Sequence, residues 1–432
     1  MPDVIQDHST AEYRCPGETY SISRAVHLGR LASFHPDCRH CPRRDDTVGL
    51  SARQIRQLAE VNSQAESPPL FYAEGIGKVA IDDLSPNLAQ RIAVEFAWQI
   101  ISARPKTTCG AGVSPAHAAG MAAPQKHGVN DGQVVSLATR DRSSQATTVV
   151  ASDGRLAAAA IIAAIVEGLR WTGCETIDIG AASAPCTARA IEHLTADGGI
   201  FVGNAHGAPH TVGLKFWGYG EPLSQGGMLD GIAASLQTQS SEMPIDRPAR
   251  TFGPLQRFAA TDLYLNDFRP AYHALRPLHF VLDCELGPVV AYLKELIRNV
   301  ACRVTPGKSG SKLGEQVLAA QAHFGMRIGD DGENCHVVDE RGQSVAAERL
   351  LALIAGSLAK SVMQGEELRQ QTFLRMRENR ATIAADTAGR LWYANSHAPL
   401  PDALRTLTHL LVLLSRDDQA FSAVLDQERP AA

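Results

Sequence analysis

The sequence lacks any long apolar run, and no segment reaches the roughly 18 consecutive apolar residues that a membrane-spanning helix needs. It also lacks a strong charge of either sign, since the net charge is -5 over 432 residues. No basic surface of the kind that binds nucleic acid is therefore expected. The first twenty residues are polar and lack the apolar core of a signal peptide. Neither a membrane nor a nucleic acid is an expected partner.

The nine cysteines are odd in number and scattered, which argues against a disulfide framework. Reduced thiols and a cytoplasmic location are the expectation. Hydrophobic residues make up 44% of the chain and charged residues 20%, which is ordinary for soluble proteins with several cores. The length favours about three domains.

Two stretches share a strand–helix–strand layout, which predicts βαβ units with parallel strands and right-handed crossovers. The first comprises Thr147–Ala151, Ala157–Trp171 and Thr176–Ile179, and the second His279–Asp283, Val289–Val300 and Arg303–Thr305. The sequence therefore predicts an α/β fold with tandem domains, each with a mixed sheet sandwiched by helices. A ligand is expected beyond the carboxyl ends of the parallel strands.

Composition divides the chain into four parts. Residues 1–67 are rich in cysteine and histidine, and the α/β domains are expected over 68–259, 260–342 and, in shortened form, 343–432. Ala259–Ala274 is the predicted linker between the first two. Residues 104–146 are dominated by small and polar side chains, which predicts a flexible insertion. Three helices are expected in the last part, over Ala347–Ser361, Gly365–Arg380 and Pro401–Leu414.

A polar loop between two predicted strands is the most specific motif. The hexapeptide Gly203-Asn-Ala-His-Gly-Ala208, followed by Gly213-Leu-Lys-Phe216, resembles the catalytic loop of the α-D-phosphohexomutases. In that family the loop reads Thr-Ala-Ser-His-Asn-Pro, and its serine carries the phosphoryl group that is exchanged with the sugar. Ala205 stands at the serine position, beside retained His206 and Lys215. The resemblance implies a mutase scaffold without its phosphoryl carrier.

A turn after the first predicted strand extends the resemblance. Val150-Ala-Ser-Asp-Gly-Arg155 resembles the Gly-Arg-Asp-x-Arg turn of the family, with its first arginine replaced by Ser152. The resemblance implies that Asp153 and Arg155 line the catalytic cleft. The alternative is a turn kept only for its backbone geometry.

The second domain carries a stretch that resembles the family's Asp-Gly-Asp-Gly-Asp-Arg magnesium loop. Its three metal positions become Gly329, Asp331 and Glu333, and its arginine becomes Asn334. Magnesium needs near-octahedral oxygen ligands. Because one of the three carboxylates is lost, the resemblance implies that magnesium binds weakly or not at all. The alternative is that the stretch is an acidic turn exposed to solvent.

The third domain carries a stretch that resembles the family's Gly-Glu-Met-Ser-Gly-His sugar loop. The residues implied to bind substrate are Asp386, Thr387, Gly389 and Arg390, where the family's glutamate is shortened and its histidine is replaced. No stretch resembles the phosphate-binding loop of the family's fourth domain, so that domain is expected to be absent.

The N-terminal part predicts a metal site of its own. Cys38 and Cys41 form a Cys-x-x-Cys pair, and Cys15 lies upstream. Thiolate and imidazole ligands at such spacing suit a tetrahedral zinc site. His27 is the candidate fourth ligand, with His35 and His40 as alternatives. An iron–sulfur cluster or unpaired thiols remain the other interpretations.

These motifs support three possible functions. The first is a catalytically inactive phosphohexomutase homologue that binds a sugar phosphate, a partner protein or both. The second is an active phosphoglucomutase- or phosphomannomutase-type phosphotransferase that uses a non-serine carrier such as His206. The third is an interaction protein with a zinc-stabilised N-terminus.

Overall fold

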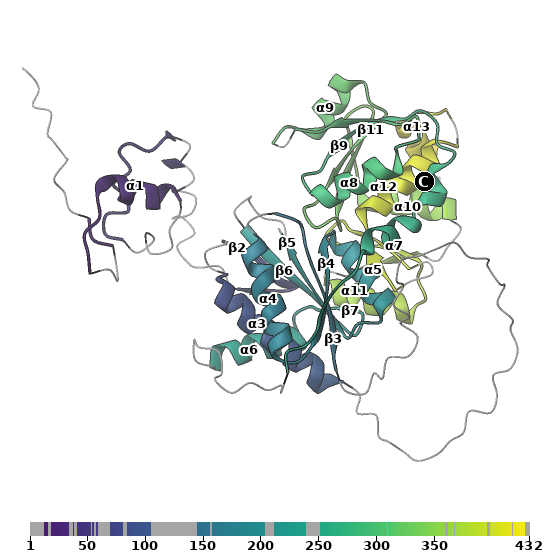
Figure 1. Cartoon of the computed structure of the whole chain (residues 1–432). Coiled ribbons are helices and arrows are strands. Elements are labelled where there is room, and N and C mark those ends of the chain that lie inside the picture. The colour runs from purple at the N-terminus through teal and green to yellow at the C-terminus, as the bar shows by residue number, and fades with distance from the viewer. Residues whose placement is uncertain are drawn as a thin grey trace, which may run out of the picture.

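A computed structural model of the chain describes most of its residues, in separate stretches. They are residues 13–15, 19–33, 38, 41–52, 54–55, 58, 70–80, 84–104, 145–155, 158–203, 211–238, 251–308, 310–358, 362–366, 368–394, 398–416 and 418–427. Within these residues the fold is mixed α/β, and its strands form three successive sheets (Figure 1).

The first sheet has the strand order β1-β2-β6-β5-β3-β4-β8, with β7 beside β6. Its strands are β1 (Phe71–Tyr72), β2 (Gly75–Ala80), β3 (Thr147–Ser152), β4 (Glu175–Ala181), β5 (Gly198–Gly203), β6 (Thr211–Gly218), β7 (Glu221–Pro222) and β8 (Leu255–Arg257). The second sheet has the order β10-β9-β11-β12-β13, and the third β14-β15-β16-β17. Their strands are β9 (His279–Asp283), β10 (Arg303–Pro306), β11 (Phe324–Ile328), β12 (Cys335–Asp339), β13 (Ser344–Val345), β14 (Val362–Gln364), β15 (Ile383–Ala385), β16 (Leu391–Tyr393) and β17 (Leu400–Pro401).

Helices cover the sheets and connect their strands. They are α1 (Arg24–Ala32), α3 (Pro86–Ala103), α4 (Ala159–Trp171), α5 (Ala184–Leu194), α6 (Met228–Thr238), α7 (Ala260–Asn266), the 3₁₀ helix η5 (Arg269–Tyr272), α8 (Gly287–Leu296), α9 (Leu313–Ala320), α10 (Ala347–Leu358), α11 (Arg369–Glu378), α12 (Ala403–Leu414) and α13 (Phe421–Gln427). Within the described ranges, no helix combines the length and apolarity needed to cross a bilayer.

The first sheet is buried on both faces. Ile200 and Val202 of β5 point into a core shared with α3 and α4, whereas Phe201 between them points into the core that contains α5. Successive strand residues face opposite sides, so one apolar strand contributes to both cores. The predicted βαβ unit is confirmed, because β3 and β4 pair in parallel around α4.

The second sheet contains the other predicted βαβ unit. Strands β9 and β10 pair in parallel around α8, and β11 pairs in parallel with the other edge of β9. The carboxyl ends of these three strands, at Asp283, Pro306 and Ile328, therefore lie along one edge of the sheet. Strands β12 and β13 complete the sheet in antiparallel pairing.

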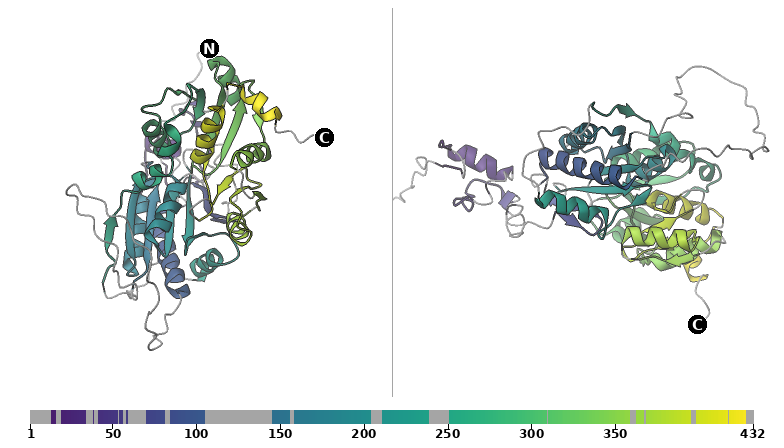
Figure 2. Two further views of the ribbon diagram at one scale, coloured as in Figure 1. Left: turned by 90° about the vertical axis from the view of Figure 1, so that its right-hand side faces the viewer. Right: turned by 90° about the horizontal axis from the view of Figure 1, so that it is seen from below.

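The predicted linker Ala259–Ala274 is a buried structural element. Its residues form α7 and η5, and Tyr264, Leu265 and Phe268 are almost fully buried. They join one hydrophobic core that runs from α5 through the second sheet to α10 and α12. Figure 2 shows the yellow C-terminal helices beside the green second sheet. The sheets therefore share one core, which fixes the loops between them.

Candidate functional site

The loop 329–334 connects β11 to β12 and is held by the first turns of two helices. The backbone N–H of Ala184 in α5 donates to the carbonyl oxygen of Asp331 at 2.9 Å. The N–H of Ala403 in α12 donates to the carbonyl of Gly332 at 3.0 Å. The first N–H groups of a helix lack partners within the helix, so they are available for such bonds. The carboxylates of the loop are thereby held in a fixed direction.

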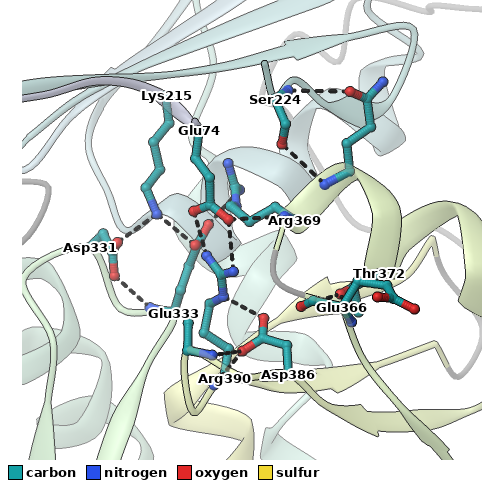
Figure 3. A network of polar contacts seen from close by, with 12 residues as sticks. Glu74, Lys215, Ser224, Asp331, Glu333, Glu366, Arg369, Thr372, Asp386 and Arg390 are labelled. Atoms are coloured by element: carbon teal, nitrogen blue, oxygen red, sulfur yellow. Dashed lines mark hydrogen bonds and ion pairs between the residues drawn. The ribbon is translucent and has the colours of Figure 1, made fainter. Parts of the chain in front are cut away.

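Lys215 of β6 lies between the two carboxylates of this loop (Figure 3). Its Nζ is 2.6 Å from Oδ2 of Asp331 and 2.6 Å from Oε2 of Glu333. The other oxygen of Glu333, Oε1, is 2.6 Å from Nη2 of Arg369 in α11. All four side chains are at most 4% exposed. They form a buried ion-pair cluster between the first, second and third sheets.

Glu74, in the turn between β1 and β2, binds the third domain. Its carboxylate accepts two hydrogen bonds from Arg390, at 2.6 and 2.8 Å, and a third from the backbone N–H of Arg369 at 2.9 Å. Burial by itself would raise the pKa of Glu74, but the Arg390 bonds and the nearby cations outweigh it and lower the pKa to about 2. Glu74 therefore stays ionised. It links Arg369, which belongs to the ion-pair cluster, to Arg390, which lies in the turn between β15 and β16.

The stretch predicted to bind sugar is a turn between β15 and β16 that Asp386 closes internally. Its carboxylate accepts Nε of Arg390 at 2.6 Å and Nε1 of Trp392 at 2.8 Å. Gly389 adopts a left-handed φ of +78°, and Thr387 is exposed. Asp386 and Arg390 are only 3% and 2% exposed and bind protein partners. Their binding to sugar hydroxyls stays a prediction.

Asp153 and Arg155 lie in the turn after β3, as the resemblance implied. The N–H of Asp153 donates to the carbonyl of Val202 at 2.9 Å, and its Oδ2 is 2.5 Å from Nε of Arg155. Asp153 lies beside Gly203, where β5 ends. Ala205 and His206 follow in the next residues and lie outside the described part of the chain.

Two residues of the interdomain ion pairs, Glu74 and Arg369, could not be identified from the sequence. Glu74 directly precedes Gly75, which has a φ of +134°. A Cβ at position 75 would lie 2.3 Å from the carbonyl oxygen of Leu214, so no side chain fits there. Arg369 is the first residue of α11, which lies within the helix predicted over Gly365–Arg380, and its guanidinium lies 5.1 Å from the centre of the Trp217 ring. Neither residue belongs to a catalytic motif that would have marked it.

The N-terminal ligand candidates are buried but not assembled. Cys15, Cys38 and Cys41 are each 5% exposed, and His27 is stacked on the Tyr13 ring at 4.4 Å. Among the residues that the structure describes, no three Cys, His, Asp or Glu side chains form a group able to hold a metal ion. The zinc site stays a prediction.

A cavity of about 810 Å³ lies beyond the carboxyl ends of β9 and β11, where the sequence predicted a ligand. Lys312, Arg327 and His336 line it, together with the carboxylates of Asp283, Glu285 and Asp330. Asn334 and, from the third domain, Ala388 complete the polar part and the rim of the lining. Arg327 is also paired with Asp283 at 2.6 Å. The cavity therefore offers cationic, anionic and neutral hydrogen-bonding groups to a small polar ligand.

The protein thus consists of several α/β domains, one for each sheet. Side chains from all three domains meet in the ion pairs of Lys215, Glu333 and Arg369, which form an interdomain site. Residues 129–242 match the family model for phosphoglucomutase/phosphomannomutase, alpha/beta/alpha domain I. The phosphoglucosamine mutase of Clavibacter sepedonicus is 28% identical over 238 residues, which are 51% of this chain and 52% of that protein. The phosphomannomutase/phosphoglucomutase of Pseudomonas aeruginosa strain PAO1 is 24% identical over 327 residues, 63% of this chain and 68% of that protein.

Solved structures share the fold. A phosphoglucomutase/phosphomannomutase family protein from Burkholderia thailandensis superposes with a TM-score of 0.65 at 18% identity, covering 84% of this chain and 80% of that one. Parafusin, a phosphoglucomutase from Paramecium, gives a TM-score of 0.57 at 12% identity, covering 83% and 73%. The chain thus contains a region that matches domain I of the phosphoglucomutase/phosphomannomutase family and shares the fold of these solved structures. It spans about half the length of the first curated relatives it matches.

The loop 329–334 does not fit the magnesium ion that the family resemblance implies. The first metal position is Gly329, and a Cβ there would lie 1.8 Å from Oδ1 of Asn334, so the space of a first carboxylate is filled. The remaining two positions, Asp331 and Glu333, already bind Lys215.

Proposed function

We propose that this protein is a non-catalytic member of the phosphohexomutase family that binds a sugar phosphate without exchanging its phosphoryl group. The observation that carries the proposal is the buried cluster of Lys215, Asp331, Glu333 and Arg369. It occupies the metal loop with protein cations, in a chain whose phosphoryl-carrier position is Ala205.

Phosphoryl transfer needs an in-line nucleophile and cations that neutralise the phosphoryl oxygens. The methyl group of Ala205 can neither accept nor donate a phosphoryl group. Lys215 and Arg369 are cations, but each is bonded to a carboxylate at 2.6 Å. Asp386 and Arg390 likewise bind each other at 2.6 Å. Lys215, Arg369, Asp386 and Arg390 are therefore all bonded to other side chains of the protein.

The proposed ligand site is the cavity beyond β9 and β11. Its volume of about 810 Å³ lies within the usual range of small-molecule sites, about 300–1,000 Å³. Lys312, which is exposed and pairs with Glu315 at 3.5 Å, and Arg327, which also pairs with Asp283, are the cations that would face a phosphate. The carboxylates of Asp283, Glu285 and Asp330, with His336 and Asn334, would face the sugar hydroxyls. The ligand would bridge the second domain and Ala388 of the third.

A primed mutase assay tests the absence of catalysis. The protein is incubated with glucose 1-phosphate or mannose 1-phosphate, each with the matching hexose bisphosphate, and formation of the 6-phosphate is measured. We expect no turnover above a protein-free blank. Turnover that disappears in His206→Ala would contradict the proposal and support an imidazole carrier.

Ligand binding is tested separately by thermal stabilisation with a panel of hexose phosphates, because a ligand of the folded state raises Tm. We expect at least one member to raise Tm, with a smaller shift in Lys312→Ala. Lys294→Ala, an exposed lysine on α8 outside the cavity, should behave as wild type. The absence of a shift with every member would remove the sugar-phosphate site.

An active phosphotransferase with a non-serine carrier is the second candidate, and the mutase names of the relatives favour it. The third candidate is an interaction protein with a metal-stabilised N-terminus, which the burial of Cys15, Cys38 and Cys41 favours. Elemental analysis of the purified protein, with Cys38→Ser as control, tests the latter. Zinc that is retained by wild type and lost in the variant would support it, and its absence would remove it.

A further inference from the structure

The four carboxylate oxygens of Asp331 and Glu333, at the family's metal positions, are all bonded to protein donors. Oδ2 of Asp331 and Oε2 of Glu333 each lie 2.6 Å from Nζ of Lys215. Oδ1 of Asp331 accepts the backbone N–H of Glu333 at 2.9 Å, and Oε1 of Glu333 accepts Nη2 of Arg369 at 2.6 Å. Bonds to charged donors at this length are among the strong hydrogen bonds of proteins. Each carboxylate oxygen thus already has a charged or backbone donor.

The formal charges of this cluster also balance. Lys215 and Arg369 contribute two positive charges, and Asp331 and Glu333 contribute two negative ones. A divalent ion added to the cluster would leave two uncompensated positive charges among side chains that are at most 4% exposed. Burying uncompensated charge is strongly unfavourable. A divalent ion would therefore enter only if Lys215 moved away.

We propose that the Lys215 ammonium is the resident cation of this loop and takes the place of a divalent metal ion. The lysine is part of β6, which pairs with β5 from Gly213 to Gly218, so its side chain approaches the loop from the first domain. Its ammonium neutralises the two carboxylates and links the first domain to the second. The proposal concerns the cation alone and does not depend on whether a sugar phosphate binds.

Removing the ammonium should expose a metal site in the loop. Lys215→Met keeps an unbranched side chain but leaves Asp331 and Glu333 facing each other without their shared cation. The variant should have a lower Tm than wild type. Because two carboxylates and the vacated space then become available to a hard cation, Mn²⁺ should bind and raise the Tm again.

The experiment is a Mn²⁺ titration of the full chain, followed by calorimetry and by Tm, without any sugar phosphate. Wild type should show no saturable Mn²⁺ binding that depends on Asp331. Lys215→Met should bind Mn²⁺ with a Kd at least about tenfold below the weakest affinity that the titration of wild type could detect. Lys294→Met, on the exposed face of α8, is the matched control and should titrate as wild type.

Two results would overturn the proposal. One is wild-type binding of one Mn²⁺ per chain that is lost in Asp331→Asn, because the carboxylates would then bind a metal in the presence of Lys215. The other is a folded Lys215→Met protein that binds no Mn²⁺, because the lysine would then not be what excludes the ion. If Lys215→Met does not fold, the wild-type and Asp331→Asn titrations decide.

Discussion

Asp402 is a fully buried carboxylate at the start of α12. It caps the helix by accepting the backbone N–H of Arg405 at 3.0 Å, and it accepts the hydroxyl of Tyr264 at 3.0 Å. Burial raises the pKa of Asp402 to about 6, although the Arg405 charge opposes the shift. The residue therefore couples a titration near neutral pH to the contact between the linker helix α7 and the C-terminal helix.

Substituting Asp402→Asn should flatten the pH dependence of stability. A carboxyl whose folded pKa of about 6 exceeds its unfolded value of 3.8 costs stability progressively as pH rises from about 4 to 6. The cost is complete above that window and amounts to about 3 kcal/mol. Urea unfolding at pH 4 and pH 8 measures it, and Asp418→Asn, at a fully exposed carboxylate, is the control. An unchanged pH profile in Asp402→Asn would contradict the assignment.

Single residues show what the sequence could and could not reveal about the site. Asp331, Glu333 and Lys215 were identified from motifs in two domains, and the structure brings them into contact. That they bind each other was not predictable, because motif spacing gives no distance between domains. Glu74 and Arg369 lie outside every motif, and only the packing of α11 against the first domain reveals them.

The turn between β15 and β16 depends on one carboxylate. Asp386 holds two backbone N–H groups as well as the Arg390 and Trp392 side chains. Asp386→Ala should destabilise the protein by about 3 kcal/mol, because it leaves a buried guanidinium without one of its partners. Chemical denaturation measures the loss. Thr387→Ala, at the exposed position next to it, should change stability little, and an equal loss in both variants would refute the assigned role.

Elements with strong periodicity were predicted well. The strand His279–Asp283 and the two βαβ units match the structure. Their apolar segments are long enough, and are separated by clear enough turns, for strands and helices to be told apart. The short strands β8, β14 and β17 were not predicted, since two or three residues carry no periodic signal. The helices α7 and η5 of the predicted linker Ala259–Ala274 were not predicted, because their apolar residues are buried through contact with elements far away in the sequence.

At the scale of the whole molecule, the domains are joined by two kinds of contact. One hydrophobic core runs through α5, the second sheet and the C-terminal helices. The ion pairs of Glu74 and Lys215 join the first domain to the third and the second, respectively. The fold class of each domain could be predicted from the sequence. The contacts between the domains could not, because they join residues that are far apart in the sequence.

The Glu74–Arg390 contact predicts sensitivity to acid. A carboxylate whose pKa is lowered from 4.5 to about 2 contributes stability above pH 4.5, and this stability is lost as pH falls toward 2. Glu74→Gln should therefore lower Tm at pH 7 and reduce its fall between pH 4.5 and 3. Glu348→Gln, an exposed carboxylate on α10, is the control. If Tm falls equally in wild type and in Glu74→Gln between pH 4.5 and 3, the Glu74–Arg390 ion pair is not the cause of the acid sensitivity.

The protein has the fold of a phosphohexomutase, and we propose that it accepts no phosphoryl group from a sugar phosphate. The most direct measurement is covalent labelling of the protein by ³²P-labelled glucose 1,6-bisphosphate, because an active family member passes through a phosphorylated form of its carrier residue. We predict no label on the denatured, washed protein. Stable labelling of wild type that is lost in His206→Ala would contradict this account and establish an imidazole carrier beside Ala205.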